Sequence, residues 1–255
     1  MSTQTTQTAP TTSGTFTDKV ALITGADGGI GRALASRLGA EGCRLVLHSH
    51  DEEGLRKTFA DEGWTDEQVL TAVHDVADTA AVEAAVAGAV TRFGKIDYLV
   101  NVAGVAHPGG VLTTSQEIWD RTLATNLTGY FVMARAVLPY MKEAGDGFVV
   151  NMSSIWGRRT APPGAMLAYS VSKWGVEGLT KALAEEARPW GVRVSGIVLD
   201  KVDTAFRANM PGDLTPEQLD RMLTAADVAD ATYAVLTSSR RAHAATIELD
   251  AWQWI

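Results

Sequence analysis

Tyr169 and Lys173 are the residues of this sequence best suited to proton transfer. Three residues separate them in Tyr169-Ser-Val-Ser-Lys173, and apolar residues then recur at three- and four-residue steps as far as Pro189, which predicts a helix. If the helix includes Tyr169, the lysine ammonium lies one turn on, near the phenol. A free phenol has a pKa of about 10, and a fixed neighbouring cation lowers it. The pair could therefore act as general acid and base on a carbonyl or alcohol oxygen. Taken alone, the same spacing is common on solvated helix surfaces.

A glycine-rich turn near the start of the chain could hold a cofactor. Residues 20–24 predict a short buried strand, and Gly25, Gly29 and Gly31 follow it at the start of a helix. Strand, glycine turn and helix in this order receive the pyrophosphate of a dinucleotide on backbone N–H groups and on the helix N-terminus. The same turn could also be only a tight connection between a strand and a helix.

The end of the second predicted strand, residues 44–48, bears on the choice of cofactor. An acidic residue there accepts both ribose hydroxyls of NAD, whereas a small or basic residue tolerates the 2′-phosphate of NADP. Aligned by length, Ser49 takes the place of the acid and His50 that of a phosphate-binding base, although Asp51 is one register position away. The sequence therefore favours NADP(H) over NAD(H).

Alternating strands and helices must bring these residues together. Further strands are predicted at 69–73, 96–101, 148–152, 192–199 and 246–249, and further helices at 80–93, 115–141 and 227–238. This order predicts an α/β fold, a doubly wound, Rossmann-like seven-stranded parallel sheet with helices on both faces. The single domain is expected to span residues 18–250, after a disordered polar tail (1–17). The apolar tail (251–255) is expected to dock on a neighbouring subunit or on its own.

Composition restricts the possible partners of the protein. The chain has 255 residues, a net charge of −8 and a sequence pI near 5.1, which gives no electrostatic case for nucleic acid or an anionic membrane. One cysteine, Cys43, excludes an internal disulfide and a cysteine-rich metal site, and we expect a buried small residue in a reducing compartment, the cytoplasm. No apolar run is long enough for a membrane span, and we expect no secretory signal and no metal.

Four short motifs together resemble the short-chain dehydrogenase/reductase family. They are Thr24-Gly-x-x-x-Gly-Ile-Gly31, Asp75-Val76, Asn101-Val-Ala-Gly104 and Tyr169-x-x-x-Lys173, in the family's order and at about its distances. The resemblance implies reversible hydride transfer between a nicotinamide cofactor and a carbonyl or secondary alcohol. It also implies a small-molecule substrate and a homo-oligomer, either a dimer or a tetramer.

The resemblance implies roles for individual residues. Ser154 would hold the substrate oxygen, Tyr169 would transfer the proton, and Lys173 would lower the tyrosine pKa and bind the ribose. Asn126 would distort its helix and keep a relay water beside the lysine; without the resemblance it would be a buried polar side chain bonded to backbone. By position, the expected cofactor contacts are Thr24, Gly25, Asp27, Gly29, Ile30, Gly31, Ser49, His50, Asp75, Val76, Asn101, Ala103, Gly104, Tyr169, Lys173, Val202 and Thr204.

The loop between Ser154 and Tyr169 departs from the family pattern. The two residues are fifteen positions apart, two more than is usual, and the longer loop should alter the pocket wall. Trp156, Met166 and Phe206 are candidate substrate contacts, with packing as the alternative for the first two. The paired arginines 158 and 159 could meet an acidic substrate group or be solvated loop charges. Residues 206–223 resemble the family's substrate lid.

A second departure lies after the sixth strand, where Leu199-Asp200 replaces the family's Pro-Gly. The Asp200 carboxylate could strengthen binding of an oxidised nicotinamide, or it could point away and pair with Lys201. Together with Val102, which replaces the family's second Asn, it hints at an alternative, a regulatory scaffold that binds the cofactor without turnover. A non-redox relative is a further alternative, but such proteins replace the lysine with arginine and fill the glycine turn.

Overall fold

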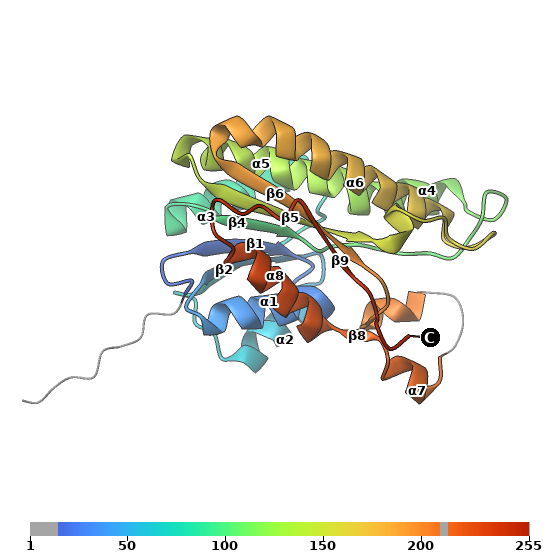
Figure 1. Ribbon diagram of the computed structural model, residues 1–255. Helices are drawn as coiled ribbons and strands as arrows, with labels where there is room; N and C mark the ends of the chain where they lie inside the picture. The colour runs from blue at the N-terminus through green and yellow to red at the C-terminus, as the bar shows by residue number, and fades with distance from the viewer. Residues whose placement is uncertain (1–14, 210–213, 255) are drawn as a thin grey trace, which may run out of the picture.

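The structure, a computed structural model, describes residues 15–209 and 214–254, and within them seven parallel strands form one sheet (Figure 1). The strands are β1 (Val20–Thr24), β2 (Arg44–Ser49), β3 (Val69–Val73), β4 (Tyr98–Asn101), β5 (Gly147–Ser154), β6 (Val192–Leu199) and β9 (Thr246–Leu249). Their order across the sheet is β3-β2-β1-β4-β5-β6-β9. The predicted doubly wound sheet is confirmed, and β5 extends through both serines because Ser153 and Ser154 still pair with β6.

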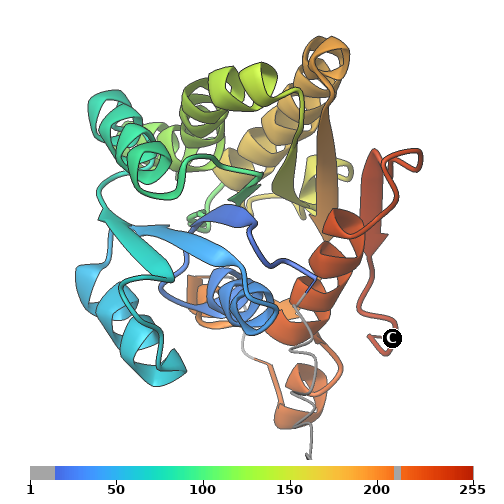
Figure 2. The ribbon, with the colours of Figure 1, turned by 90° about the vertical axis from the view of Figure 1, so that its left-hand side faces the viewer.

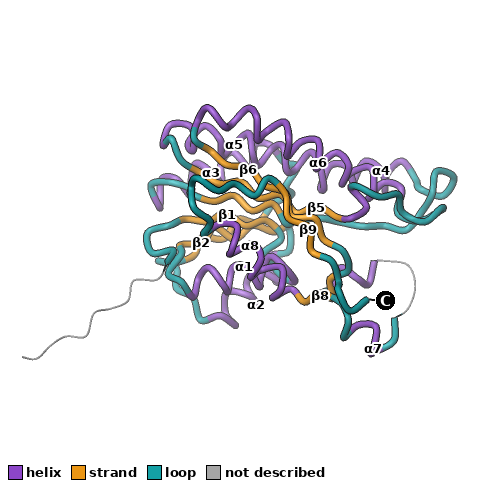
Figure 3. Tube along the Cα trace, viewed as in Figure 1, coloured by secondary structure: helices purple, strands orange, loops and turns teal. Residues whose placement is uncertain are grey.

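Helices cover both faces of the sheet. They are α1 (Gly29–Ala40), α2 (Glu52–Glu62), α3 (Thr79–Phe93), α4 (Gln116–Leu123), α5 (Gly129–Ala144), α6 (Leu167–Ala187) and α8 (Ala225–Leu236). Figures 1 and 2 show α3, α4, α5 and α6 on one face and α1, α2 and α8 on the other, and Figure 3 shows the strands as the middle layer. None of the helices in the described part of the chain combines the length and hydropathy needed to cross a bilayer.

The core consists of two apolar layers because successive strand side chains point to opposite faces. In β1, Ala21 and Ile23 pack under α1 and α8, whereas Val20 and Leu22 pack against the layer of α3 and α5. The chain winds outward from β1 to β3 and then returns to β4 on the other side of β1. The loops after β1 and β4 therefore diverge, which leaves a crevice at the carboxyl ends of the strands.

The helix predicted over 115–141 is interrupted in the structure. Ser115 caps α4 by accepting a hydrogen bond from the Ile118 N–H, and α4 and α5 are joined by a π-helical segment, Ala124–Thr128. Asn126 lies in this segment, so the distortion expected around it is confirmed. Its amide oxygen accepts from the Val105 N–H at 2.8 Å, and its amide nitrogen donates to Val105 O and Ser172 Oγ. These competing bonds explain the local change of helix type.

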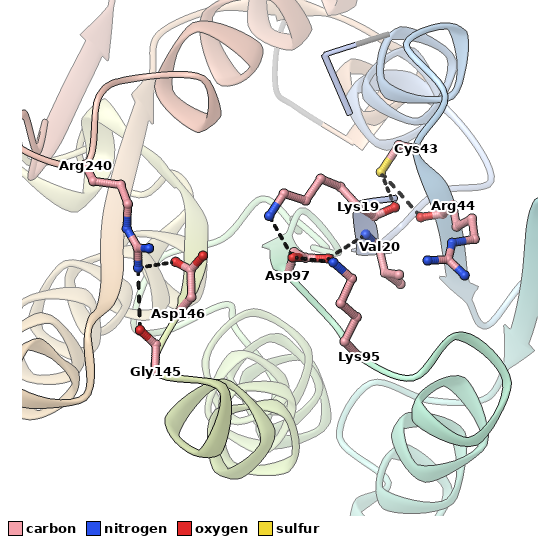
Figure 4. A network of polar contacts seen from close by, with 9 residues as sticks. All are labelled: Lys19, Val20, Cys43, Arg44, Lys95, Asp97, Gly145, Asp146 and Arg240. Atoms are coloured by element: carbon pink, nitrogen blue, oxygen red, sulfur yellow. Dashed lines mark hydrogen bonds and ion pairs between the residues drawn. The ribbon is translucent and has the colours of Figure 1, made fainter. Parts of the chain in front are cut away.

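Ion pairs at the amino-terminal edge of the sheet tie β1 to β4 (Figure 4). Asp97, directly before β4, accepts from Lys19 Nζ at 3.0 Å, from Lys95 Nζ at 3.1 Å and from the Val20 N–H at 2.9 Å. Cys43 lies beside this network with its thiol donating to Lys19 O, and burial raises the pKa of that thiol to about 12. The interpretation of Cys43 as a buried small residue is confirmed.

Both ends of the folded region differ from the expected boundaries. Most of the predicted tail (1–17) lies outside the described residues, but Phe16 is buried in the core beside Tyr98 and Tyr233, so the folded part includes it. At the other end Ala251 is buried and Trp254 is half-buried against this same chain. Of the two alternatives for the apolar tail, contact with its own subunit is therefore present.

Candidate active site

A cavity of about 730 Å³ opens at the carboxyl ends of the parallel strands. The glycine turn after β1 forms one part of its wall, and Ser154, Tyr169 and Lys173 form another. The cavity therefore joins the two groups of residues that the sequence separates by more than a hundred positions. Its size is that of a typical small-molecule or cofactor site.

Ser154 and Tyr169 meet in this cavity. Ser154 ends β5, Tyr169 lies in the first turn of α6, and the Ser154 hydroxyl is close enough to the phenol to lower its pKa. Lys173 follows one turn on, with its Nζ 5.7 Å from the centre of the Tyr169 ring. The predicted helix and the shared face of Tyr169 and Lys173 are both confirmed.

Burial dominates the electrostatics of the phenol. Only 6% of Tyr169 is exposed, and burial raises the pKa of Tyr169 to about 12, while the Ser154 hydroxyl acts in the opposite direction. Desolvation of the phenolate decides the direction of this shift, and the lowering of the Tyr169 pKa by Lys173 stays a prediction. The phenol is therefore held in its protonated form.

Lys173 is held by the backbone of β5. Its ammonium donates to Met152 O at 2.8 Å, and the same carbonyl accepts from the Tyr130 hydroxyl at 3.2 Å. Burial lowers the pKa of Lys173 to about 8, and Glu177, one turn further along α6, raises it. The lysine therefore carries its charge at neutral pH and loses it at mildly alkaline pH.

The glycine turn is packed too tightly for side chains. Gly25 has φ +65°, and a Cβ there would lie 3.0 Å from Ala103 Cα. A Cβ on Gly31 would lie 2.1 Å from Gly25 O. Thr24 Oγ1 accepts from the N–H groups of Val102 and Ala103 at 2.9 and 3.0 Å and so fixes the loop after β4 beside the turn. Thr24 and Gly31 thus shape the turn without lining the cavity.

The far end of the cavity is lined by residues that follow β2 and β3. Asp51 does not line it: its carboxylate caps α2 by accepting from the Gly54 N–H at 3.1 Å. Ser49 Oγ accepts from the Asp51 N–H at 3.0 Å. His48 also lines the cavity, and one of its ring nitrogens lies 3.2 Å from a ring nitrogen of His74. Burial lowers the pKa of His48 to about 3, so its imidazole is neutral.

Most of the residues predicted from the sequence line this one cavity. They are Gly25, Asp27, Gly29, Ile30, Ser49, His50, Asp75, Val76, Ala103, Gly104, Ser154, Trp156, Tyr169, Lys173, Val202, Thr204 and Phe206. Five do not line it: Thr24, Gly31, Asn101, Asn126 and Met166. For Asn126 the bonds to Val105 and Ser172 account for the side chain, and its role in a water relay stays a prediction.

Asn101 was expected to contact the cofactor, but its side chain lies in the core. Its amide donates to Asn151 Oδ1 at 2.9 Å, and the Asn151 amide donates to Thr180 Oγ1 at 2.9 Å. All three are buried between the sheet and α6. Side-chain alternation along β4 explains the difference, since Asn101 points to the same face as Leu99 and not out of the strand end.

This chain of buried amides predicts a stability effect. Replacing Thr180 with valine is expected to lower the free energy of unfolding by about 1–3 kcal/mol, because the Asn151 amide loses its acceptor in the core. Chemical denaturation measures the change. Thr232→Val is the matched control, since Thr232 is also buried in a helix but bonds back to Val228 O of that helix. Its expected loss is smaller, below about 1 kcal/mol, because no buried side-chain donor is left without its acceptor, and equal losses in the two variants would contradict the role of Thr180.

Aromatic side chains surround the phenol. The Trp156 ring lies edge-on to Tyr169 at 6.2 Å between ring centres, and the Phe206 ring lies at 5.9 Å. Met166 is fully buried at the N-terminus of α6, with φ +58°, and packs with Ala106 and Tyr169. Of the two interpretations of Met166, packing is therefore the one that the structure supports.

The paired arginines do not reach the cavity. Arg158 contacts Glu177 Oε2 at 2.9 Å and Glu248 Oε2 at 3.1 Å, and Arg159 contacts Glu248 at 3.2 Å. These ion pairs join the longer loop to α6 and β9. The two arginines therefore neither meet an acidic substrate group nor act as solvated loop charges, which were the two alternatives from the sequence. Glu177 lies 19 residues and Glu248 about 90 residues further along the chain, so the sequence around the two arginines could not predict these ion pairs.

Several wall residues were not predicted from the sequence. They include Arg121 and Thr125 near the end of α4, Leu214 and Met222 in the expected lid, Lys201 after β6, and Trp254 in the C-terminal tail. The expected lid contains a 3₁₀ helix (Ala205–Asn209), α7 (Pro216–Leu219) and β8 (Leu223–Thr224), which pairs with β7 (Val202–Asp203); residues 210–213 lie outside the described residues. Asp200 lines the cavity and also pairs with Lys201 at 3.1 Å.

The sequence is similar to that of known enzymes. A family profile described as short chain dehydrogenase matches residues 19–214. Levodione reductase of Leifsonia aquatica is 40% identical over 214 residues, which cover 82% of this chain and 78% of that protein. The 2,5-dichloro-2,5-cyclohexadiene-1,4-diol dehydrogenase LinX of Sphingobium indicum is 35% identical over 204 residues, which cover 80% of this chain and 81% of that protein.

Solved structures show the same fold. The 3-ketoacyl-(acyl-carrier-protein) reductase from Brucella melitensis, complexed with NADH, matches with a TM-score of 0.85 and 28% identity, over 94% of this chain and 100% of that one. A metagenomic short-chain oxidoreductase in complex with NADP matches with a TM-score of 0.77 and 31% identity, over 92% of this chain and 97% of that one.

Proposed function

The chain belongs to the short-chain dehydrogenase family and transfers a hydride between a nicotinamide cofactor and a carbonyl or secondary alcohol, and we propose that Tyr169 is its general acid and base. The observation that carries this proposal is that Ser154, Tyr169 and Lys173 line one cavity, with the Ser154 hydroxyl acting on the phenol and Lys173 one helix turn away. The alternative of a regulatory or non-redox scaffold finds no support among the relatives, which are named as a reductase and a dehydrogenase.

Each of the four catalytic candidates has a defined role in this proposal. Ser154 donates a hydrogen bond to the substrate oxygen and holds it next to the phenol. Tyr169 gives its proton to that oxygen during reduction and accepts a proton during oxidation. Lys173 stabilises the phenolate that remains and contacts the ribose, and Asn126 keeps the relay water beside the lysine. The proton therefore passes through groups that are buried and fixed in place.

The residues around the glycine turn fit a dinucleotide. The turn has room for backbone approach only, since a Cβ on Gly25 would meet Ala103 and a Cβ on Gly29 would lie 3.3 Å from Thr204 Cγ2. The N-terminus of α1 follows directly and favours a pyrophosphate. When bound, the nicotinamide supplies or accepts the hydride. The proposed contacts are the residues predicted above that line the cavity.

A steady-state assay tests the proposed role of the cavity. Purified protein is mixed with NADPH or NADH and a panel of ketones, and the absorbance of the reduced nicotinamide is followed. Turnover that depends on both cofactor and ketone supports the proposal. Tight cofactor binding without turnover on any ketone would contradict acid–base catalysis at Tyr169.

The pH dependence of ketone reduction follows from the buried lysine. Because the pKa of Lys173 is about 8, the ammonium is present below this pH and lost above it. We expect kcat/KM for reduction to be constant below about pH 7 and to fall as the pH rises through about 8, since this parameter reports the free enzyme. Initial rates in overlapping buffers measure the profile. A fall only near the ordinary lysine value of about 10.4 would contradict the assigned group.

We propose that the enzyme prefers NADP(H) to NAD(H). Ser49 and His50 line the cavity at the end of β2, and the Asp51 carboxylate is engaged at the N-terminus of α2. A small hydroxyl residue beside an imidazole tolerates a 2′-phosphate better than a carboxylate does. The proposed preference for NADP(H) rests on Ser49, His50 and Asp51 at the end of β2.

Replacing Ser49 with aspartate should reverse this preference. Two negative charges about 4 Å apart repel by about 4 kcal/mol at an effective dielectric constant of 20, and solvent at this open end reduces that value. We therefore expect kcat/KM for NADPH to fall about 10- to 100-fold while that for NADH is retained or rises. Ser49→Asn adds the same volume without charge and is the control. An unchanged ratio of NADPH to NADH in the aspartate variant would exclude Ser49 from the phosphate site.

We propose a cyclic ketone or secondary alcohol as the substrate class. The walls next to Tyr169 are apolar and aromatic, with Trp156 and Phe206 on the phenol and Met222 nearby in the lid. Flat apolar molecules stack favourably on such rings. A relative is named for a cyclohexadiene diol, a cyclic secondary alcohol, which agrees with this class.

We also propose a cytoplasmic homo-oligomer, either a dimer or a tetramer. Phe131 on α5 and Val171 and Trp174 on α6 are large apolar side chains that are 40–52% exposed on helices that pack together. Exposed apolar patches of this kind mark protein interfaces. The compartment is inferred from the single, buried cysteine. Light scattering measures the assembled mass, and a monomer at micromolar concentration would contradict the assembly.

A further inference from the structure

The C-terminal segment of the chain turns back onto the active-site cavity. Ala251 is buried directly after β9, and the Trp254 N–H donates to Ala251 O at 2.8 Å, which closes a turn. Trp254 is half-buried and lines the cavity, whereas Trp252, two residues earlier, is 89% exposed. Figure 1 shows this end of the chain beside β8 and α7, the elements of the expected lid. The two tryptophans of one short segment thus have opposite surroundings.

Lys201 holds the indole at this position. Its Nζ lies 4.8 Å from the centre of the Trp254 ring and 3.1 Å from Asp200 Oδ1. The backbone around it is fixed on two sides, because the Asp200 N–H donates to Leu249 O and the Leu223 N–H donates to Lys201 O. A cation over the face of an indole is a favourable contact. The ring is therefore held between the end of β6, the end of β9 and the lid.

Trp254 lines the same cavity as the aromatic cluster around Tyr169. The Tyr169 ring already contacts Trp156 and Phe206, and Met222 of the lid is buried next to the cavity. Leu199-Asp200, directly before Lys201, is where the sequence departs from the family's Pro-Gly. Lys201, the residue directly after the substituted pair, contacts Trp254, and Asp200 of that pair contacts Lys201.

We propose that Trp254 is a specificity-determining residue, whose indole contacts the apolar face of a cyclic substrate while Tyr169 and Ser154 contact its oxygen. This inference rests on the proposed function and names the side chain that selects its substrate class. An indole offers a flat, rigid surface that matches a ring over its whole face, whereas a flexible open chain loses more conformational freedom to make the same contact. Trp254 therefore contributes to binding of cyclic ketones more than to binding of open-chain ketones.

The test compares two ketones with the same number of carbon atoms, cyclohexanone and hexan-2-one, in the full-length enzyme with saturating NADPH. For Trp254→Ala we expect kcat/KM for cyclohexanone to fall about 10-fold, the scale of a lost apolar pocket contact, mainly through KM. The value for hexan-2-one should change by less than about three-fold. Trp254→Phe keeps a flat apolar ring and should recover most of the loss. Trp252→Ala removes the exposed neighbouring tryptophan and should leave both values unchanged.

The outcomes separate the inference from the function on which it rests. If the wild-type enzyme reduces neither ketone with either cofactor, the proposed function and the inference both fail. If the wild-type enzyme reduces the ketones and Trp254→Ala lowers both values equally, or Trp252→Ala has the same effect, the inference alone is overturned. Thermal unfolding of each variant shows whether the fold is intact.

Lys201→Met provides a second variant. It should lower kcat/KM for cyclohexanone alone, by about two- to three-fold.

Discussion

Replacing Tyr169 with phenylalanine is expected to lower kcat for ketone reduction by about 10³-fold, within the range of 10²–10⁴ typical of a lost general acid. The substitution removes one oxygen and leaves the ring between Trp156 and Phe206, so the cavity keeps its shape. The affinity for NADPH, measured by nicotinamide fluorescence, should stay within about three-fold. A large loss of turnover with intact cofactor binding would assign the proton transfer to this hydroxyl.

Tyr98→Phe is the matched control for this experiment. Burial raises the pKa of Tyr98 to about 12, as it does for Tyr169, but Tyr98 begins β4 and does not line the active-site cavity. Its turnover is expected to equal that of the wild-type enzyme. If Tyr169→Phe retained full kcat, the assignment of Tyr169 as the acid would be wrong, whatever the control did.

Replacing Gly31 with alanine is expected to abolish cofactor binding and to destabilise the fold. The new Cβ would lie 2.1 Å from Gly25 O and 2.7 Å from Gly25 C, so the contact is with backbone that no rotamer change can relieve. Separating the first turn of α1 from the glycine turn should lower the free energy of unfolding by about 2–3 kcal/mol. We expect the affinity for NADPH to fall by more than about 100-fold, because the N–H groups of the turn would no longer converge.

Thermal unfolding and a cofactor titration measure these two effects. Gly88→Ala is the control, since Gly88 lies inside α3 and a Cβ there would have no neighbour within 4 Å. Alanine at this helix position should stabilise the protein by about 0.5–1 kcal/mol. A Gly31→Ala variant that bound NADPH and unfolded like the wild type would show that the turn can relax. It would contradict the glycine turn as the binding site of the pyrophosphate.

The sequence predicted the elements well where a local pattern decides the structure. Apolar strands of five to eight residues are long enough to be recognised, and Pro189 marks the end of the helix that carries Tyr169 and Lys173. Ser154 and Tyr169 could be predicted to meet because the carboxyl ends of parallel strands share one edge of the sheet. Even the distortion around Asn126 had a local signal, a short polar amide inside a helix.

Properties that depend on distant parts of the chain could not be predicted in this way. The raised pKa of Tyr169 follows from burial, which is set by Trp156, Phe206 and the lid together. The partners of Arg158 lie on α6 and β9, and the contact of Trp254 with Lys201 joins two strand ends that are neighbours only in the folded sheet. For Asn101, by contrast, the alternation of side chains along β4 indicates a core position, whereas its place in a family motif indicates a cofactor contact.

The hydrogen bond from the Lys173 ammonium to the Met152 carbonyl explains how the enzyme tolerates its longer loop. Met152 and Ser154 are two positions apart on the same buried strand, and a strand rises about 3.3 Å per residue. The distance between Met152, which binds the lysine ammonium, and Ser154 is therefore set by the backbone of β5 alone. Residues added between Ser154 and the start of α6 alter the space open to a substrate but leave this distance unchanged. Evolution can therefore remodel the substrate entrance of this enzyme by insertion without retuning the distances on which its chemistry depends.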